Sequence, residues 1–377
     1  MSRRHYLDHA STSPLRPEAR DALTQLLELG HDIGLGDPGR IHTEGMTARG
    51  LVEDAREQVA TLLGARSREV VFTSGATEAI AAAVWGGGSR GGHQVFAAVE
   101  HSAVREHATR AGEVTVVGVD RLGRIDPEEM LRAIRPDTAM VHLQWGNHEV
   151  GTLQPVAEVV AACRERGVLV HVDAAQAAGR VPIAFGDLGA DLMSTSAHKL
   201  GGPTGVGALL VRRGVRLPPL LLGGDQERAR RAGHENTLGV VAFGAVAEAL
   251  ADGDRLGAES TANRRQSERV AALAGMVEGM EILGDPHERL PHITCLAVAG
   301  VEPQPVLIGL DRAGVSVHSG SSCASESLEP SPVLEAMGVD AHRSLRVSVG
   351  WSTTDADVDA FVEALPGIVT ELRSLAG

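Results

Sequence analysis

Residues 168–211 read VLVHVDAAQAAGRVPIAFGDLGADLMSTSAHKLGGPTGVGALLV and contain three short runs rich in aliphatic residues. From about residue 50 to residue 212, such runs alternate with longer segments of helical spacing, which is typical of a parallel sheet with crossover helices. We therefore expect an α/β fold with a large, mainly parallel, seven-stranded sheet. The expected strands are Glu69–Phe72, Gln94–Ala97, Val114–Val117, Ala139–Leu143, Val168–Val172, Leu192–Thr195 and Gly207–Val211.

The pattern changes near residue 250, where a smaller α+β domain is expected to begin. The prediction is a large domain of residues 16–250 and a small domain of residues 1–15 plus 251–377. In the first part, helices are expected at Ala76–Trp85, Ala103–Arg110, Pro127–Ile134 and Pro155–Arg166. Farther along, we expect helices at Thr237–Asp252, Thr261–Glu278 and Asp355–Leu375, and strands near Ile293–Val298 and Leu345–Val349.

Composition narrows the class of protein. The net charge of −14 disfavours direct binding to nucleic acid or to an anionic membrane, because either would need a basic patch. Cys163, Cys295 and Cys323 are far apart, which indicates neither a metal site nor a disulfide framework. No apolar run reaches the roughly 18 residues that a membrane span needs. We expect a cytoplasmic protein without a structural metal.

A lysine follows the strand-like run Leu192–Thr195, in the segment Ser196-Ala-His-Lys199. Side chains at the carboxyl ends of parallel strands face the crevice where α/β sheets bind ligands. An isolated lysine would be a solvated surface charge, but Ser196 and His198 can donate hydrogen bonds to a phosphate beside it. The Lys199 amine can form a Schiff base with an aldehyde cofactor such as pyridoxal 5'-phosphate (PLP).

An acid precedes that lysine by about 26 residues, in His171-Val-Asp-Ala-Ala-Gln176. A carboxylate facing the pyridine nitrogen of PLP keeps that nitrogen protonated, so the ring can accept electrons from a substrate. On its own, Asp173 at a strand end would be a helix cap. Its position before the lysine segment favours the role in cofactor binding.

Two other strand ends carry candidate residues. In Val71-Phe-Thr-Ser-Gly-Ala-Thr-Glu78, the free amides of Ala76 and Thr77 at a helix start suit a phosphate, although a capped helix needs no ligand. In Glu100-His-Ser-Ala-Val104, His101 could lie over a cofactor ring and move protons, or be structural.

Cys323 lies in Val317-His-Ser-Gly-Ser-Ser-Cys-Ala-Ser325, among small polar residues. Most free cysteines are buried small hydrophobes, as we expect for Cys163 and Cys295. A polar loop of this kind instead presents a thiolate to another molecule, so Cys323 is the candidate nucleophile.

Together these motifs resemble the cysteine desulfurases of the NifS/IscS type, over essentially the whole chain. The matching segments also include Tyr6-Leu-Asp, Asn147-His-Glu-Val-Gly-Thr and Ser319-Gly-Ser-Ser-Cys. The resemblance implies a fold-type I PLP enzyme of the class-V aminotransferase family. It also implies a homodimer, with active sites at the subunit interface, that makes L-alanine from L-cysteine and leaves a persulfide on Cys323.

The resemblance also implies a role for each matching residue. Lys199 holds PLP and moves the substrate Cα proton, Arg346 clamps the substrate carboxylate, and Cys323 accepts the sulfur. The expected cofactor residues are Ala76, Thr77, His101, His148, Asp173, Gln176, Ser196, His198, Lys199 and His234, and Asn147 is expected to contact the substrate.

Three histidines depart from the family pattern: His9, His148 and His234. Because an imidazole can donate a hydrogen bond, we expect PLP binding to be retained, with rate, pH optimum and substrate range open to change. About 23 residues separate Cys323 from Arg346, which resembles the long-loop desulfurases and suggests transfer of sulfur to a separate protein. The alternatives are a selenocysteine lyase, another PLP lyase or aminotransferase of this fold, and a non-catalytic scaffold for sulfur-handling partners. The final destination of the sulfur stays open.

Overall fold

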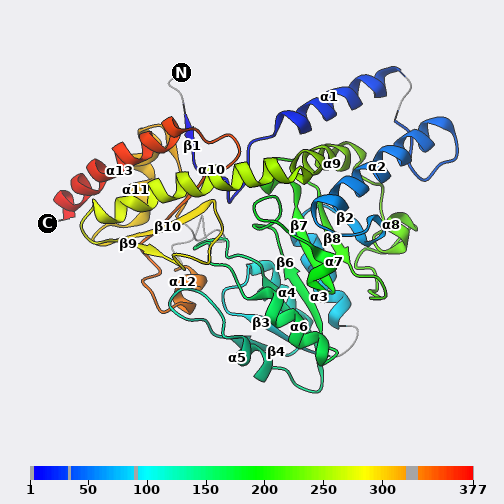
Figure 1. Cartoon of the computed structure of the whole chain (residues 1–377), viewed down its shortest axis with the longest axis horizontal. Coiled ribbons are helices and arrows are strands. Elements are labelled where there is room, and N and C mark those ends of the chain that lie inside the picture. The colour runs from blue at the N-terminus through cyan, green and yellow to red at the C-terminus, as the bar shows by residue number, and fades with distance from the viewer. Residues whose placement is uncertain (1–3, 33–34, 89–91, 320–329, 377) are drawn as a thin grey trace.

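The fold is built around one large sheet and one small sheet. The computed structural model describes residues 4–32, 35–88, 92–319 and 330–376 (Figure 1). The large sheet has seven strands in the order β2-β8-β7-β6-β5-β3-β4, and only β8 runs antiparallel to its neighbours. The strands are β2 Val70–Thr73, β3 His93–Ala97, β4 Val114–Val117, β5 Thr138–Gln144, β6 Leu169–Asp173, β7 Leu192–Ser196 and β8 Gly207–Val211. All seven predicted strands are confirmed, each within one residue at either end.

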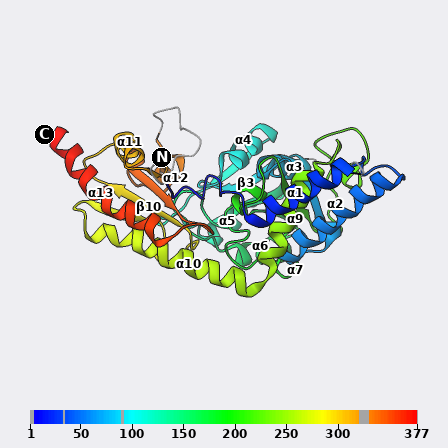
Figure 2. The same cartoon turned by 90° about the horizontal axis from the view of Figure 1, so that it is seen from above.

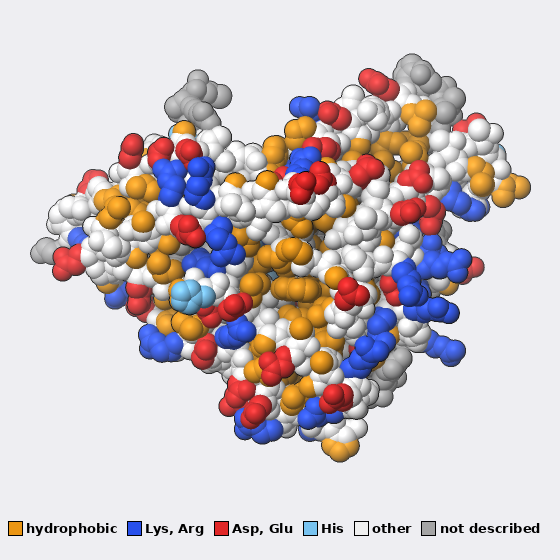
Figure 3. All heavy atoms as spheres, in the orientation of Figure 1, with side chains coloured by type: hydrophobic (Ala, Val, Ile, Leu, Met, Phe, Trp, Pro, Cys, Tyr) orange, Lys and Arg blue, Asp and Glu red, His pale blue; other side chains and the backbone are white. Residues whose placement is uncertain are grey.

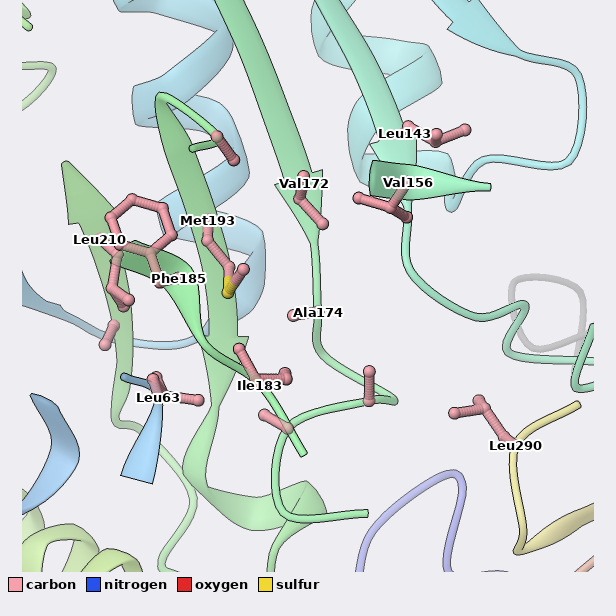
Figure 4. Packing of buried hydrophobic residues seen from close by; sticks show 14 of the residues in the cluster. Leu63, Leu143, Val156, Val172, Ala174, Ile183, Phe185, Met193, Leu210 and Leu290 are labelled. Atoms are coloured by element: carbon pink, nitrogen blue, oxygen red, sulfur yellow. The ribbon is translucent and has the colours of Figure 1, made fainter. Parts of the chain in front are cut away.

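Helices cover both faces of the large sheet. Alanines of α3 and residues of α4 pack on one face, with Met140 and Phe96 of the strands. On the other face, Val172, Met193 and Leu210 from three neighbouring strands lie in one layer with other apolar side chains (Figure 4). The helices of this half are α1 Pro17–Asp32, α2 Thr43–Leu62, α3 Ala76–Gly88, α4 Ser102–Ala111, α5 Pro127–Arg132, α6 Val156–Glu165, α7 Phe185–Leu188, α8 Gln226–Ala229 and α9 Thr237–Ala251.

The smaller half holds a three-stranded antiparallel sheet, ordered β12-β10-β9, and the short pair β1-β11. Its strands are β1 His5–Tyr6, β9 Met280–Leu283, β10 Ile293–Val298, β11 Val315–Ser316 and β12 Ser344–Ser348. Its helices are α10 Gly253–Ala271, α11 Pro303–Arg312, α12 Pro332–Ala336 and α13 Asp355–Ala376. The predicted strands near β10 and β12 and the closing helix are therefore confirmed.

The expected helix over 261–278 was wrong at both ends. Helix α10 begins at Gly253 because Asp252 caps it by accepting the amide of Asp254, directly after α9 ends. From there α10 runs across to the smaller sheet (Figure 2). The boundary predicted near residue 250 falls at this junction and stays a prediction. Within the described ranges, no helix is both long and apolar enough to cross a membrane.

Candidate active site

A cavity of about 470 Å³ opens where strands of the large sheet end. In parallel strands these ends meet at one edge, so residues far apart in sequence come together there. Arg346 reaches the cavity from β12 of the smaller sheet. The sequence-predicted residues that line it are Ala76, Thr77, His101, His148, Asp173, Gln176, Ser196, His198, Lys199 and Arg346.

Lys199 ends a short 3₁₀ turn that follows β7. Its Nζ donates to the carbonyl oxygen of Ala10 at 2.5 Å. Burial and the nearby Arg346 guanidinium lower the pKa of Lys199 to about 8. An amine with this pKa is partly neutral near physiological pH, which a nucleophile requires.

Asp173 is the last residue of β6, and its Oδ1 accepts the amide of Ala175 at 2.9 Å. Burial raises the pKa of Asp173, while the Ala175 amide, His148 and Lys199 act in the opposite direction. Gln176 follows on the same edge, and its Nε2 donates to Ala10 O at 2.8 Å. Gln176 and Lys199 thus share one backbone acceptor.

His101 caps α4, where its Nδ1 accepts the amide of Ala103 at 3.1 Å. Its ring meets the ring of His148 edge-on, with centroids 5.1 Å apart. Burial, then His148 and Lys199, lower the pKa of His101 to about 3. His101 is therefore a neutral imidazole with its proton on Nε2.

Arg346 and His148 leave two buried nitrogens without partners in this cavity. Nη1 of Arg346 donates to His148 O at 2.8 Å, and Nη2 donates to Asp8 Oδ1 at 3.0 Å and Ser11 Oγ at 2.7 Å. Arg346 Nε and His148 Nδ1 have no partner among the described atoms. Arg346 Nε is thus a buried donor without an acceptor, and the guanidinium is the cationic group that lines this side of the cavity.

The start of α3 offers backbone donors to the same cavity. Amides of the first helical turn lack partners within the helix and suit an anion. The turn before α3 packs closely on β8, because a Cβ at Gly207 would lie 2.7 Å from the backbone of Gly75. His198 stands beside this turn, with Nδ1 3.2 Å from Thr12 Oγ1. Burial and Lys199 lower the pKa of His198 to about 4.

Two predicted site residues that the structure describes, Asn147 and His234, are not among the residues that line the cavity. Asn147 is buried, with Nδ2 donating to Val99 O and Oδ1 accepting the amides of Glu149 and Val150, so its contacts are structural. His234 is exposed, and Nδ1 lies 3.9 Å from Asp37 Oδ1. Cys323 lies outside the described residues.

His9, another departure from the family pattern, is buried away from the cavity lining and contacts Ser13 and Thr353. The sequence reading also missed Asp8, Ala10 and Ser11, which bind Arg346 or Lys199. They lie beside the quoted Tyr6-Leu-Asp motif, but no local pattern links that motif to a residue more than 300 positions away.

Known proteins resemble the chain over its whole length. A family model described as aminotransferase class-V matches residues 5–361. Cysteine desulfurase IscS of Dictyoglomus turgidum is 37% identical over 388 residues, which cover 100% of this chain and 97% of that protein. A cysteine desulfurase of Cereibacter sphaeroides is 40% identical over 386 residues, covering 99% and 97%.

Solved structures agree with these relatives. A NifS-like protein has a TM-score of 0.89 and 30% identity, covering 98% of this chain and all of that one. A structure described as SspA in complex with cysteine has a TM-score of 0.81 and 27% identity, covering 92% of this chain and 99% of that one. The chain therefore belongs to the class-V aminotransferase family, among the cysteine desulfurases of the NifS and IscS type.

Proposed function

We propose that the protein is a PLP-dependent cysteine desulfurase that converts L-cysteine to L-alanine and holds the sulfur as a persulfide on Cys323. The observation that carries the proposal is the cavity that joins Lys199, Asp173, the start of α3 and Arg346. The Lys199 amine can bind an aldehyde, and the Asp173 carboxylate can pair with a pyridine nitrogen. The amides at the start of α3 suit a phosphate, and the Arg346 guanidinium suits a carboxylate.

The cavity residues fit PLP. Lys199 would bind its aldehyde carbon, Asp173 its ring nitrogen, and Ala76, Thr77, Ser196 and His198 its phosphate. When bound, PLP supplies an electron sink for the electron pair that remains when the substrate Cα loses its proton. Gln176 stays close to Lys199 through their common bond to Ala10 O and would donate to the ring oxygen.

The protein groups position the substrate and move protons. Arg346, which lines the cavity, would hold the substrate carboxylate through its guanidinium. The Lys199 amine, when free, would be a base of suitable pKa for the Cα proton. The neutral His101 ring can hold or pass on a proton at Nε2.

The segment that carries Cys323 leaves and returns beside the cavity. Ser319 O accepts from Ser344 Oγ at 2.6 Å, two residues before Arg346. At the other end, Ser331 Oγ donates to Glu149 Oε2 at 2.5 Å, next to His148. Both described ends of the segment that carries Cys323 are thus bonded to residues that neighbour Arg346 or His148, which supports a role for Cys323 at this site.

In the sulfur-transfer step, a bond forms between Cys323 Sγ and the substrate sulfur while the carbon–sulfur bond breaks. The electrons of the broken bond remain with the carbon, which gains a proton and becomes the methyl group of alanine. The persulfide then passes to an acceptor, for which we propose a separate protein.

The test combines a spectrum, a product assay and a mass measurement. Purified protein with PLP should be yellow and should form alanine and sulfide from L-cysteine with a reductant. Cys323→Ser should keep the colour and lose both products, whereas the buried-cysteine control Cys163→Ser should keep both. Peptide mass spectrometry should find the extra sulfur on Cys323. Lys199→Ala should lose the absorbance of bound PLP.

Three outcomes would favour the alternatives. Unchanged turnover in Cys323→Ser would support another lyase or an aminotransferase of this fold. Activity confined to selenocysteine would support a selenocysteine lyase. A protein that stays colourless after PLP is added would support the scaffold.

We further propose a homodimer in the cytoplasm. Large apolar side chains stand exposed on the large-sheet half, with Ile41 93% and Leu222 83% exposed, and a partner that covered them would remove this apolar surface from water. Charged side chains are spread over the face shown in Figure 3. Cys163 and Cys295 are free thiols, as expected in a reducing compartment. Sedimentation should show twice the chain mass, and Ile41→Asp should shift it to the monomer. In the dimer, His234 is proposed to reach the partner's phosphate site.

A further inference from the structure

Five polar side chains lie in a row under α3, inside the large sheet. They are Gln94 of β3, His142 of β5, His171 and Asp173 of β6, and Ser194 of β7. His142 pairs in register with His171, and Asp173 with Ser194, so the row crosses the sheet on one face. Only Asp173 reaches the cavity.

Each member is hydrogen bonded to the next. Gln94 Oε1 lies 2.6 Å from His142 Nε2, and His142 Nδ1 lies 3.1 Å from His171 Nδ1. His171 Nε2 lies 3.1 Å from Ser194 Oγ, and Ser194 faces Asp173 in register on the neighbouring strand, where its hydroxyl lowers the pKa of that carboxyl. Burying so many polar groups beneath an apolar helix is costly unless all of them are paired.

The protons in the hydrogen bonds of the row can be placed in only two ways. Both imidazoles are neutral, because burial lowers the pKa of His142 to about 3 and that of His171 well below its ordinary value. A neutral imidazole has one N–H and one lone pair, so the two rings must point their donors in the same direction. Either every donor points toward Asp173 or every donor points toward Gln94.

The direction depends on the charge of Asp173 and on the amide of Gln94. If donors pointed toward Gln94, the Ser194 hydroxyl would donate to His171, and Asp173 would have to be protonated to bond Ser194. In that arrangement Gln94 accepts through Oε1, and its Nε2 is buried without a partner. A half-turn of the amide gives Nε2 an acceptor on His142 and reverses the whole row; the position without a partner then holds the carbonyl oxygen, and buried acceptors are left unpaired less rarely than buried N–H donors.

We propose that Gln94, His142, His171 and Ser194 form a hydrogen-bonded chain whose donors all point to Asp173 and hold its carboxylate ionised. These four residues, which do not line the cavity, are positioning residues. The inference rests on the proposed function in one respect, that Asp173 is the partner of the PLP ring nitrogen. An ionised, oriented carboxylate is what that nitrogen needs in order to stay protonated.

The direct test is the proton position on each ring. Full-length protein labelled with ¹⁵N-histidine, with and without PLP, is measured by NMR at one pH, and His142→Asn and His171→Asn assign the signals. We expect the proton on Nδ1 of His142 and on Nε2 of His171. The opposite pair, Nε2 of His142 and Nδ1 of His171, would overturn the proposal, whatever the activity of the protein.

A second measurement uses PLP affinity and a matched control. His93 is equally buried on β3, but it bonds Thr115 and Thr138 and does not belong to the row. Ser194→Ala and His142→Leu should weaken PLP binding on the order of tenfold, as expected for losing a hydrogen bond to a charged group. His93→Leu should leave it within about twofold. Equal losses in all three variants would mean that the row serves only packing. Because binding is measured by absorbance, failure of the desulfurase activity would not affect this result.

Discussion

Arg346 is paired with Asp8 across 338 positions of sequence, with Nη2 3.0 Å from Oδ1. The arginine is 1% exposed on its side chain, so the pair is largely shielded from solvent. A substrate carboxylate that binds Arg346 must share the guanidinium with Asp8. The ion pair therefore positions Arg346 and at the same time competes with the substrate.

The first prediction concerns this competition. Asp8→Asn keeps an acceptor for Nη2 but removes the negative charge, so KM for L-cysteine should fall severalfold with little change in kcat. Ser11→Ala is the control, since it removes a neutral acceptor of the same Nη2. Steady-state kinetics of both variants gives the KM and kcat for L-cysteine that are compared with those of the unmodified protein. A raised KM in Asp8→Asn would mean that the charge is needed to hold Arg346 in place.

The second prediction concerns the pH at which PLP is taken up. Burial and the cations Arg346 and Arg180 lower the Lys199 pKa to about 8, whereas Asp173 and Asp8 raise it. The neutral amine that attacks the aldehyde is the form present above this pKa. Uptake of PLP by the stripped protein, followed by absorbance, should therefore accelerate as pH rises through about 8. Arg346→Gln should move the midpoint upward, because a cation that favours the neutral amine is lost. A midpoint that stays in place would contradict this assignment.

The large sheet was predictable because its strands, apart from the edge strand β4, are buried along almost their whole length. Such strands read as short aliphatic runs, and all seven were located within one residue. The ligand-facing residues then followed from their place at strand ends. Lys199, Asp173 and His101 were found in this way, and the cavity brings them together.

Other features depend on contacts that the local sequence does not contain. The start of α10 depends on the Asp252 cap rather than on hydrophobic spacing. Helices α1 and α2, which precede the first strand of the large sheet in the sequence, were not predicted. The role expected for Asn147 came from the resemblance alone, and its three bonds to backbone appear only in the folded chain.

The third prediction concerns a buried ion pair that supports an unusual turn. Arg56 binds Glu227 through two bonds of 2.6 and 2.9 Å, and Glu227 also accepts the amide of Phe72. Glu227 and the two residues after it are left-handed, with φ of 48°, 59° and 61°. Glu227→Ala should lower the free energy of unfolding by about 3–5 kcal/mol, because it removes the buried carboxylate and leaves the buried guanidinium with the half-exposed Glu53 as its ionic partner. Urea denaturation measures this loss.

Glu53 provides the control for that measurement. It also pairs with Arg56, at 3.0 Å, but its side chain is 46% exposed. Glu53→Ala should cost less than about 1 kcal/mol, as exposed pairs do. If Glu227→Ala and Glu53→Ala lower the free energy of unfolding by similar amounts, burial does not set the strength of these ion pairs.

The fourth prediction concerns the packing of His9. Gly350 lies against the ring, and a Cβ added there would overlap it. The ring itself is held by Ser13 Oγ at 3.0 Å and Thr353 Oγ1 at 3.3 Å, so it cannot move aside freely. Gly350→Ala should therefore cost about 1–3 kcal/mol of stability, as overpacking does. In a His9→Ala background the same change should cost almost nothing. Denaturation of the two single variants and the double variant gives the coupling between the sites. If the stability losses of the two single variants simply add, Gly350 is required for its backbone conformation. It is then not required to make room for the His9 ring.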